Sequence, residues 1–519
     1  MELKDINFGD VDAKNEILKQ KRTGGRDFFN SYSIPSKIDI TEYLDGRKYF
    51  ILGLKGTGKT ALLRYLHDKV IHEDKLSELI LFKSHVTEED RQHLSKGAGF
   101  QIVSTDDVPT FIQDFKESWK WLIYQKIAAK MQSADINSSS ASKLYKLTGT
   151  SNSRLTSTLG ALFSKISSGS IKFSGEALGV AVDVGIELDR TKGTAEISLS
   201  SVNRVCAELL NDIDHQAIYL FFDELELFHQ TSDQFDRDRR IIRDLVYAIA
   251  QINGDSAEHG RTLFLVSSLR TEVLHSVLEL GHEIGRDVDD YGEKLDWSDV
   301  KDAPDHPLLN LIAKKISVSS GVDEADVWKK FFPTNINNQE YYRFILNSSL
   351  YRPRDIVRLL RVARDYKKDS STFTTAHFDQ TSTEYSKQTW LEITEELLAS
   401  YSTQEISALQ RFLLGFNTHF FKSDVEARWQ KRYKTDKEVQ ALFDRKGVNN
   451  ILADLYRIGV LGNDFIAKRA HGGTNRRYRW IFRGNTSLND SERMAIHKSL
   501  WKHLSLVPGT GSIKRRGDH

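Results

Sequence analysis

The sequence predicts an α/β fold with a mainly parallel sheet. Apolar runs at residues 49–52, 217–222 and 262–268 each read as a short buried strand, and each is followed by polar turn residues and a helical pattern. Strands that alternate with helices are typical of βαβ units, whose strands run parallel. We therefore expect a parallel sheet that is covered by helices.

The first strand, 49–52, leads into a glycine-rich turn and then the helical pattern ALLRYLHDKV. A second strand is expected at 78–83, and apolar side chains recur at helical spacing over 108–131, as on a helix that faces a core. An arginine-bearing helix is expected at 235–252, before the strand at 262–268.

The chain has 519 residues, which is too long for one ordinary hydrophobic core, so we expect several domains. The pattern predicts a polar lead-in over 1–47 that packs on the core, an α/β core over 48–285, a helical lid over 286–385, a C-terminal domain over 386–506 and a disordered tail over 507–519.

Residues 132–200 are expected to form an insertion in the core. Their first part is rich in Ser and Thr, and 176–200 alternates apolar and polar residues around Lys192-Gly193, as in a β-hairpin. The alternative is a long decorated loop.

Composition indicates a cytoplasmic globular protein. Hydrophobic residues make up 39% and charged residues 28% of the chain, and the formal net charge is only +1. One cysteine, Cys206, excludes an internal disulfide framework. The polar N-terminus does not resemble a signal peptide, and no run approaches the roughly 20 apolar residues of a membrane helix.

The turn between the first strand and its helix reads Gly53-Leu-Lys-Gly-Thr-Gly-Lys59-Thr60, the pattern G-x-x-x-x-G-K-T. Glycines let successive N–H groups point at one centre, the lysine supplies a cation for phosphate oxygens, and the threonine hydroxyl can coordinate Mg²⁺. Coincidence is the alternative, but the flanking strand and helix argue against it. The predicted nucleotide-binding residues are Gly53, Lys55, Gly56, Thr57, Gly58, Lys59, Thr60 and Ala61.

The strand AIYLFFDELELF ends in two acids, Asp223 and Glu224. Ligands of open parallel sheets bind at the carboxyl ends of the strands. We expect Asp223, with Thr60, to hold Mg²⁺ and Glu224 to act as the general base toward water. Taken alone, the two acids would indicate a strand that ends at the surface. Because the glycine turn occurs in the same predicted domain, a magnesium site is the favoured interpretation.

Further polar residues follow other predicted strands and helices. Ser267 or Ser268 is a candidate sensor of the phosphate or the water, with Arg270 just beyond. The segment Tyr351-Arg-Pro-Arg-Asp355 opens a helix and is expected to aim Arg352 or Arg354 at the nucleotide. For each arginine a structural salt bridge is the alternative. The arginines of the helix at 235–252 (Arg237, Arg239, Arg240 and Arg243) are expected on a solvated face rather than as a finger in trans.

Together GLKGTGKT, FFDELELF, SSLRTEV and YRPRD resemble the additional-strand P-loop class, the AAA+ and STAND ATPases. The resemblance implies ATP and Mg²⁺ as ligands, and sensor roles for positions like Ser267–Arg270 and Arg354. FGDVDAKNE, LDW and HPLLNLIAKKI further resemble a prokaryotic P-loop ATPase family with members linked to phage defence. No LSGGQ-like signature is present, which argues against an ABC-type ATPase.

Residues 426–486 hold 14 Lys or Arg and 6 Asp or Glu, a net charge of +8. A helical segment, a β-hairpin that turns at Gly472-Gly473 and a closing helix resemble a winged helix. Its basic residues are candidates for DNA contact: Lys468, Arg469, Arg476, Arg477 and Arg479, with His471 at the tip. Protein contact is the alternative.

The sequence thus favours an ATP-hydrolysing switch, in an antiviral defence system, that acts on a separately encoded partner protein or on DNA, and a homo-oligomer remains open. A DNA-binding initiator or loader, and a nucleotide-gated scaffold with little turnover, are the alternatives.

Overall fold

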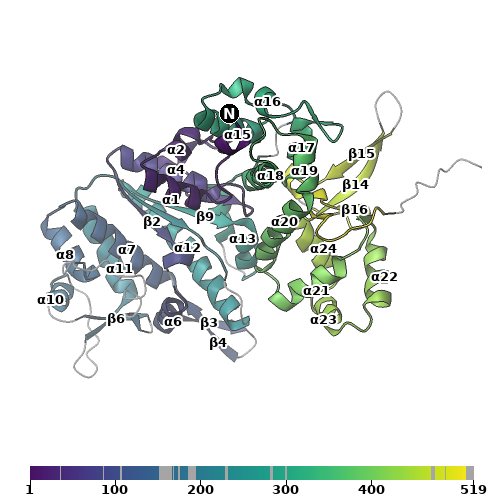
Figure 1. Ribbon diagram of the computed structural model, residues 1–519. Coiled ribbons are helices and arrows are strands. Elements are labelled where there is room, and N and C mark those ends of the chain that lie inside the picture. Colours follow the sequence, from purple (N-terminus) through teal and green to yellow (C-terminus); the bar gives the residue numbers. More distant parts are fainter. Residues whose placement is uncertain are drawn as a thin grey trace, which may run out of the picture. The chain divides into compact units, whose positions relative to one another are not determined.

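The computed structural model describes residues 1–35, 37–85, 87–105, 108–150, 166–167, 169–173, 176–184, 195–227, 232–280, 284–297, 301–468, 474–485 and 487–509 (Figure 1). The chain divides into two compact units. One, here called the sheet unit, comprises Ile38–Gly53 and Lys59–Lys294; the other, the helical unit, comprises Met1–Lys37, Leu54–Gly58 and Leu295–His519.

A parallel sheet of five strands forms the centre of the sheet unit. Its strand order is β10 (Gly292–Lys294), β1 (Phe50–Gly53), β9 (Leu263–Arg270), β8 (Ile218–Asp223) and β2 (Leu76–Leu81). Every neighbouring pair is parallel. The α/β class and the mainly parallel sheet are thereby confirmed.

Helices cover both faces of this sheet. All six residues of β8 are buried, as expected of a strand between two helical layers. Leu220 and Phe222 share a core with α7 (Lys116–Ser133) and α12 (Ser232–Glu258). Alternate side chains of a strand point to opposite faces, and Phe221 accordingly meets His67 of α4 (Lys59–His72), with ring centroids 5.7 Å apart.

Smaller elements complete the sheet unit: α3 (Ile40–Leu44), α5 (Phe82–His85), α6 (Glu88–Gly97), β3 (Gly99–Thr105), β4 (Val108–Asp114), α8 (Ser139–Thr148), β5 (Ile166–Ser167), β6 (Ser170–Phe173), α10 (Glu176–Asp183), β7 (Ala195–Ser198), α11 (Leu199–Asn211), α13 (Thr271–Leu278) and α14 (Ile284–Tyr291). The apolar stripe predicted over 108–131 is strand β4 in its first part and helix α7 in its second, because β4 pairs with β3.

The start of the β-hairpin predicted over 176–200 is wrong, whereas residues 185–194 of that prediction lie outside the described residues. Glu176–Asp183 is the helix α10, and β7 pairs with β6 instead, in a small antiparallel sheet with β5. Glu, Ala and Leu are strong helix formers, and this preference prevails over the short alternation of apolar residues. The predicted turn at Lys192-Gly193 lies outside the described residues.

The helical unit contains one continuous hydrophobic core, from Leu3 to Leu504. Its elements before residue 400 are η1 (Leu3–Asp5), α1 (Ala13–Thr23), α2 (Asp27–Ser31), α15 (Pro307–Ser320), α16 (Glu324–Phe331), β11 (Asn335–Ile336), β12 (Gln339–Glu340), α17 (Tyr341–Ser348), α18 (Pro353–Tyr366), α19 (Thr375–Gln380) and α20 (Ser382–Leu397). The predicted lid and C-terminal domain therefore share a core. The lead-in is divided between the units after Lys37.

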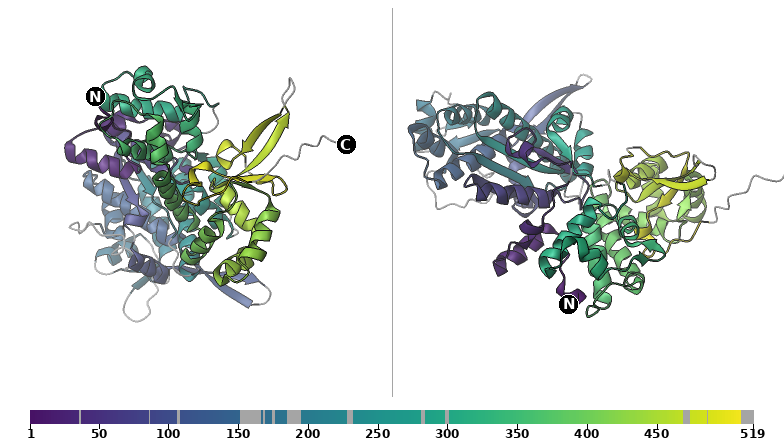
Figure 2. Two further views of the ribbon diagram at one scale, coloured as in Figure 1. Left: turned by 45° about the vertical axis from the view of Figure 1, so that its right-hand side comes forward. Right: turned by 90° about the horizontal axis from the view of Figure 1, so that it is seen from above.

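The C-terminal part of this unit has α21 (Thr403–Leu413), α22 (Lys422–Arg432), α23 (Lys437–Lys446) and α24 (Val448–Arg457) beside an antiparallel sheet. The sheet order is β13 (His419–Phe420), β16 (Arg493–Ile496), β14 (Leu461–Lys468) and β15 (Thr474–Arg479), with η2 (Ile481–Arg483) after β15. The β14–β15 pairing confirms the hairpin, which extends from the helices (Figure 2).

The closing helix predicted near residue 500 is wrong. This segment forms β16 and the single turn η3 (Lys498–Leu500), because residues 493–496 pair with both β13 and β14. Pairing within the sheet prevails here over a helical pattern. No helix in the described part of the chain has the length and apolar character to cross a membrane.

Candidate functional site

The glycine turn follows β1 directly, and α4 begins at Lys59. Gly56 and Gly58 have φ of +83° and +101°, a region that side chains disfavour, so the motif glycines are needed for this path. Lys59 is 7% exposed, and its Nζ donates to the carbonyl oxygen of Gly53 at 2.9 Å. The motif lysine is therefore folded back along its own loop.

Three predicted residues meet at the carboxyl end of β8. Asp223 is 2% exposed, and its Oδ1 accepts hydrogen bonds from Ser268 Oγ at 2.5 Å and Thr60 Oγ1 at 3.3 Å. The structure brings them together because β9 lies beside β8 and α4 crosses the same sheet edge. Ser267, the alternative sensor, has a buried hydroxyl with no hydrogen-bond partner in the described ranges.

The other oxygen of Asp223, Oδ2, is buried and has no hydrogen-bond partner among the described residues. A buried carboxylate oxygen without a partner is costly, and a cation would satisfy it. Within the described ranges no three His, Cys, Asp or Glu side chains form a metal-binding group. The donor set fits Mg²⁺, which takes one or two protein oxygen ligands and completes its shell with phosphate and water.

Glu224 continues the chain in the left-handed region, with φ of +61°. A non-glycine residue in this conformation stores strain, as is common at functional sites. The half-buried carboxylate accepts a hydrogen bond from Ser84 Oγ of α5 at 2.6 Å. Ser84 follows the neighbouring strand β2; it was not predicted, since a lone serine after a strand is not a motif.

Arg270 at the end of β9 forms an ion pair with Glu226, which also accepts from Lys83 Nζ at 2.8 Å. In this structure Arg270 therefore forms the structural salt bridge that was the alternative to a role at the nucleotide. Glu226, which lies two residues after Glu224 in the sequence, thus pairs with both Arg270 and Lys83.

In the helical unit, Lys55 and Arg354 meet a single carboxylate. Arg354 donates to Glu392 of α20, and Lys55 Nζ lies 3.2 Å from the same oxygen, Oε1. Lys55 also pairs with Glu395. The backbone N–H of Arg354 donates to the carbonyl oxygen of Gly56 at 3.4 Å, so the loop lies against the start of α18.

Arg352, the alternative to Arg354, has a structural contact instead. Its side chain is 2% exposed, and its guanidinium pairs with Glu396 and donates to the carbonyl oxygen of Ile458 at 2.9 Å. Neither Glu392 nor Glu396 could be found from the sequence, because acids on an amphipathic helix are usually solvated.

The solvated face predicted for the α12 arginines is wrong for three of the four. Arg237 pairs with Glu88 at 2.8 Å, Arg239 with the carbonyl oxygen of Ser276, and Arg243 with Asp244 at 2.6 Å. Their side chains are 11%, 12% and 3% exposed. Arg237 and Arg239 tie α12 to α6 and α13, whereas Arg243 pairs within α12.

Acids partly neutralise the basic hairpin β14–β15. Arg476 Nε lies 2.8 Å from Asp464, and Arg479 pairs with Glu492 at 2.7 Å and lies over the ring of Phe465. Arg477 is exposed. Arg469 and His471 are outside the described residues, and the side chain of Lys468 is not described.

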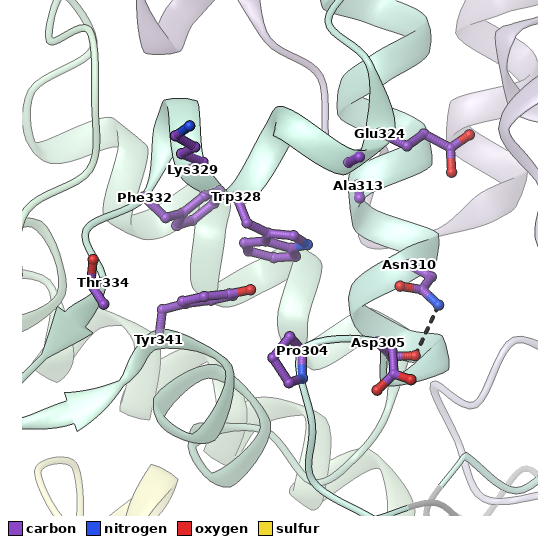
Figure 3. A pocket seen from close by; sticks show the side chains of 11 residues that line it. Pro304, Asp305, Asn310, Ala313, Glu324, Trp328, Lys329, Phe332, Thr334 and Tyr341 are labelled. Carbon is purple, nitrogen blue, oxygen red and sulfur yellow. Dashed lines mark hydrogen bonds between the residues drawn. The ribbon is translucent and has the colours of Figure 1, made fainter.

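A separate pocket of about 650 Å³ lies in the helical unit, between α15, α16 and the start of α17 (Figure 3). Trp328 stacks on Tyr341, with ring centroids 5.2 Å apart, and its buried Nε1 has no acceptor in the described structure. Asn310 on the facing wall donates to the carbonyl oxygen of Asp305 at 2.9 Å. No predicted site residue lines this pocket.

Comparison with protein families gives one match. Residues 306–394 match the family described as the FunZ-associated C-terminal helical domain, a segment that contains α15–α19 and most of α20, with Arg354 and Glu392. No curated protein matches the sequence.

Proposed function

We propose that this protein is an ATPase that binds Mg²⁺-ATP at the glycine turn and works as a nucleotide-dependent switch. The proposal is carried by Asp223. This buried carboxylate, with one oxygen open, lies beside the motif threonine and at the carboxyl edge of a parallel sheet.

The strand order supports the proposal. β9 lies between β1, which leads into the glycine turn, and β8, which ends in the two acids. A strand in this position is the feature for which the additional-strand class is named. The sequence resemblance to that class and the order of the sheet are separate observations.

Each residue has a role that its chemistry fits. The turn N–H groups and Lys59 would bind phosphate oxygens, and Thr60 and Asp223 would hold Mg²⁺, which neutralises phosphate charge when it is bound. Glu224 would orient water and take its proton, with Ser84 holding the carboxylate in place. Ser268 positions Asp223.

A role in antiviral defence, through a separately encoded partner, is the wider part of the proposal. It is supported by the sequence resemblance of residues 1–370 to a prokaryotic ATPase family. The initiator alternative predicts ATP turnover that duplex DNA stimulates, and the scaffold alternative predicts tight ATP binding without turnover.

Two substitutions test the proposal in the full chain. Lys59→Ala should abolish Mg²⁺-ATP binding in calorimetry, whereas Lys69→Ala, which removes from the same helix a partly exposed lysine that pairs with Glu73, should leave it unchanged. Glu224→Gln should keep ATP affinity and lower the hydrolysis rate by about 100-fold or more, since it removes the proton acceptor. Unchanged hydrolysis in Glu224→Gln would exclude this general base. Absence of nucleotide binding by the wild type would exclude the proposal.

A further inference from the structure

Three cations surround one carboxylate in the helical unit. Oε1 of Glu392 is contacted by Lys55 from the glycine turn and by Arg354, and Oε2 accepts from Arg358 Nη2 at 2.7 Å. Arg354 and Arg358 are one turn apart on α18, so both reach the same acid of α20.

This cluster is largely removed from water. The side chains of Lys55, Arg358 and Glu392 are 7%, 5% and 12% exposed. Burial alone would raise the pKa of Glu392, but Arg354, Lys55 and Arg358 outweigh it and lower that pKa well below its usual range. The carboxylate is therefore ionised, and the three cations need an anion at this place.

Glu395 supplies a second, more exposed acid. It pairs with Lys55, and 59% of its side chain is exposed, so its hold on the lysine is the weaker of the two. Two carboxylates thus contact a lysine of the phosphate-binding motif.

Lys55 and Arg354 are also two of the residues in this unit that the sequence assigns to a nucleotide. Carboxylate and phosphate oxygens bind cations through the same charge-assisted contacts, so one can replace the other. A Cβ on Gly56 would lie 3.2 Å from Cβ of Arg354, which shows how closely the turn and α18 approach.

We propose that Glu392 and Glu395 form an internal anion that competes with the phosphate groups of a nucleoside triphosphate for Lys55 and Arg354. Binding of the nucleotide displaces the two acids and releases this part of α20 from the turn. The inference rests on the proposed function, and it names the element that would report nucleotide binding.

α20 has contacts that could transmit the release. Ser386 Oγ accepts a hydrogen bond from the N–H of His503 at 2.9 Å, and Trp390 stacks on the ring of His503. The helix therefore joins the glycine turn to the C-terminal segment of the same unit.

The first test uses Glu395→Gln, which keeps the size of the side chain and leaves Glu392 to hold the cluster. Removing one competitor should lower the Kd for Mg²⁺-ATP by about fivefold in calorimetry. Glu384→Gln is the matched control, because Glu384 is an exposed acid on the same helix that accepts a hydrogen bond from the neutral Gln388. Its Kd should equal that of the wild type.

The second test is hydrogen exchange of the wild type with and without Mg²⁺-ATP. Amides around 388–397 should exchange faster when ATP is bound, and tripolyphosphate in place of ATP shows whether phosphate groups alone suffice for the effect. If the wild type binds ATP but its amides exchange no faster, the internal-anion inference is wrong and the proposed function stands. The same holds if the wild type binds ATP and Glu395→Gln leaves the Kd unchanged. Failure of the wild type to bind any nucleotide would overturn the proposed function and this inference with it.

Discussion

At the scale of single residues, Asp223 illustrates a conflict between stability and binding. One carboxylate oxygen is well satisfied by Ser268 and Thr60, while the other is buried with no partner in the described structure. A buried carboxylate oxygen that the folded protein leaves without a hydrogen-bond partner is typical of binding sites.

Asp223→Asn should therefore leave the free energy of unfolding of the nucleotide-free protein unchanged or raise it by up to about 1 kcal/mol, since a neutral amide costs less to bury than a charge. The same variant should lose Mg²⁺-dependent ATP binding. Urea unfolding and calorimetry measure the two effects.

Asp244→Asn is the control for this substitution. Asp244 is also buried, but it accepts from Arg243 at 2.6 Å and from the N–H of Phe115 at 2.8 Å. Removing its charge breaks the buried ion pair with Arg243 and should cost about 3 kcal/mol. Equal losses of stability in the two variants would contradict the role assigned to Asp223.

The sequence could predict Thr60, Asp223 and Ser268 as a group because the carboxyl ends of parallel strands meet at one sheet edge. It could not predict Glu392. This acid comes more than 300 residues after Lys55 and belongs to no motif, and only the packing of α18 against α20 brings the two together.

At the scale of elements, the local sequence pattern was sufficient to predict a strand or helix where hydrophobic periodicity and residue propensity agreed. The apolar strands β1, β8 and β9 and the helix after the glycine turn occur where the sequence predicts them. Where propensity and periodicity disagreed, as in α10, or where a distant strand decided the outcome, as in β16, the pattern alone was misleading.

The helix α10 can be tested at Gly179, which is exposed, with no atoms within 4 Å of an added Cβ. Gly179→Ala should raise the free energy of unfolding by roughly 0.5–1 kcal/mol, because alanine favours the helix and restricts the unfolded chain. Thermal or urea unfolding measures the change.

Gly149 supplies the opposite case in the same unit. It ends α8 with φ of +72°, where a side chain is strained, so Gly149→Ala should destabilise by about 1 kcal/mol. A loss of stability in Gly179→Ala would contradict a helix at that position.

At the scale of the whole molecule, the charge is unevenly distributed along the chain. The net charge of all 519 residues is +1, whereas 426–486 alone carry +8 and 281–306 carry −6. Ion pairs reduce the effective charge of the hairpin β14–β15, since Arg476 and Arg479 have acidic partners. Among the described arginines of this hairpin, Arg477 should therefore contribute most to any contact with a polyanion.

If the hairpin contacts DNA, we expect weak binding of duplex DNA that falls steeply with salt, because phosphate contacts release counterions. Arg477→Ala should then lower the affinity about threefold to tenfold and reduce the slope of log K against log salt by about one. Fluorescence anisotropy over a salt series measures both quantities. Arg457→Ala on α24 is the matched control, since this exposed arginine is already paired with Asp454 at 2.8 Å. Binding that Arg477→Ala leaves unchanged would exclude the hairpin as the DNA contact and favour a protein partner there.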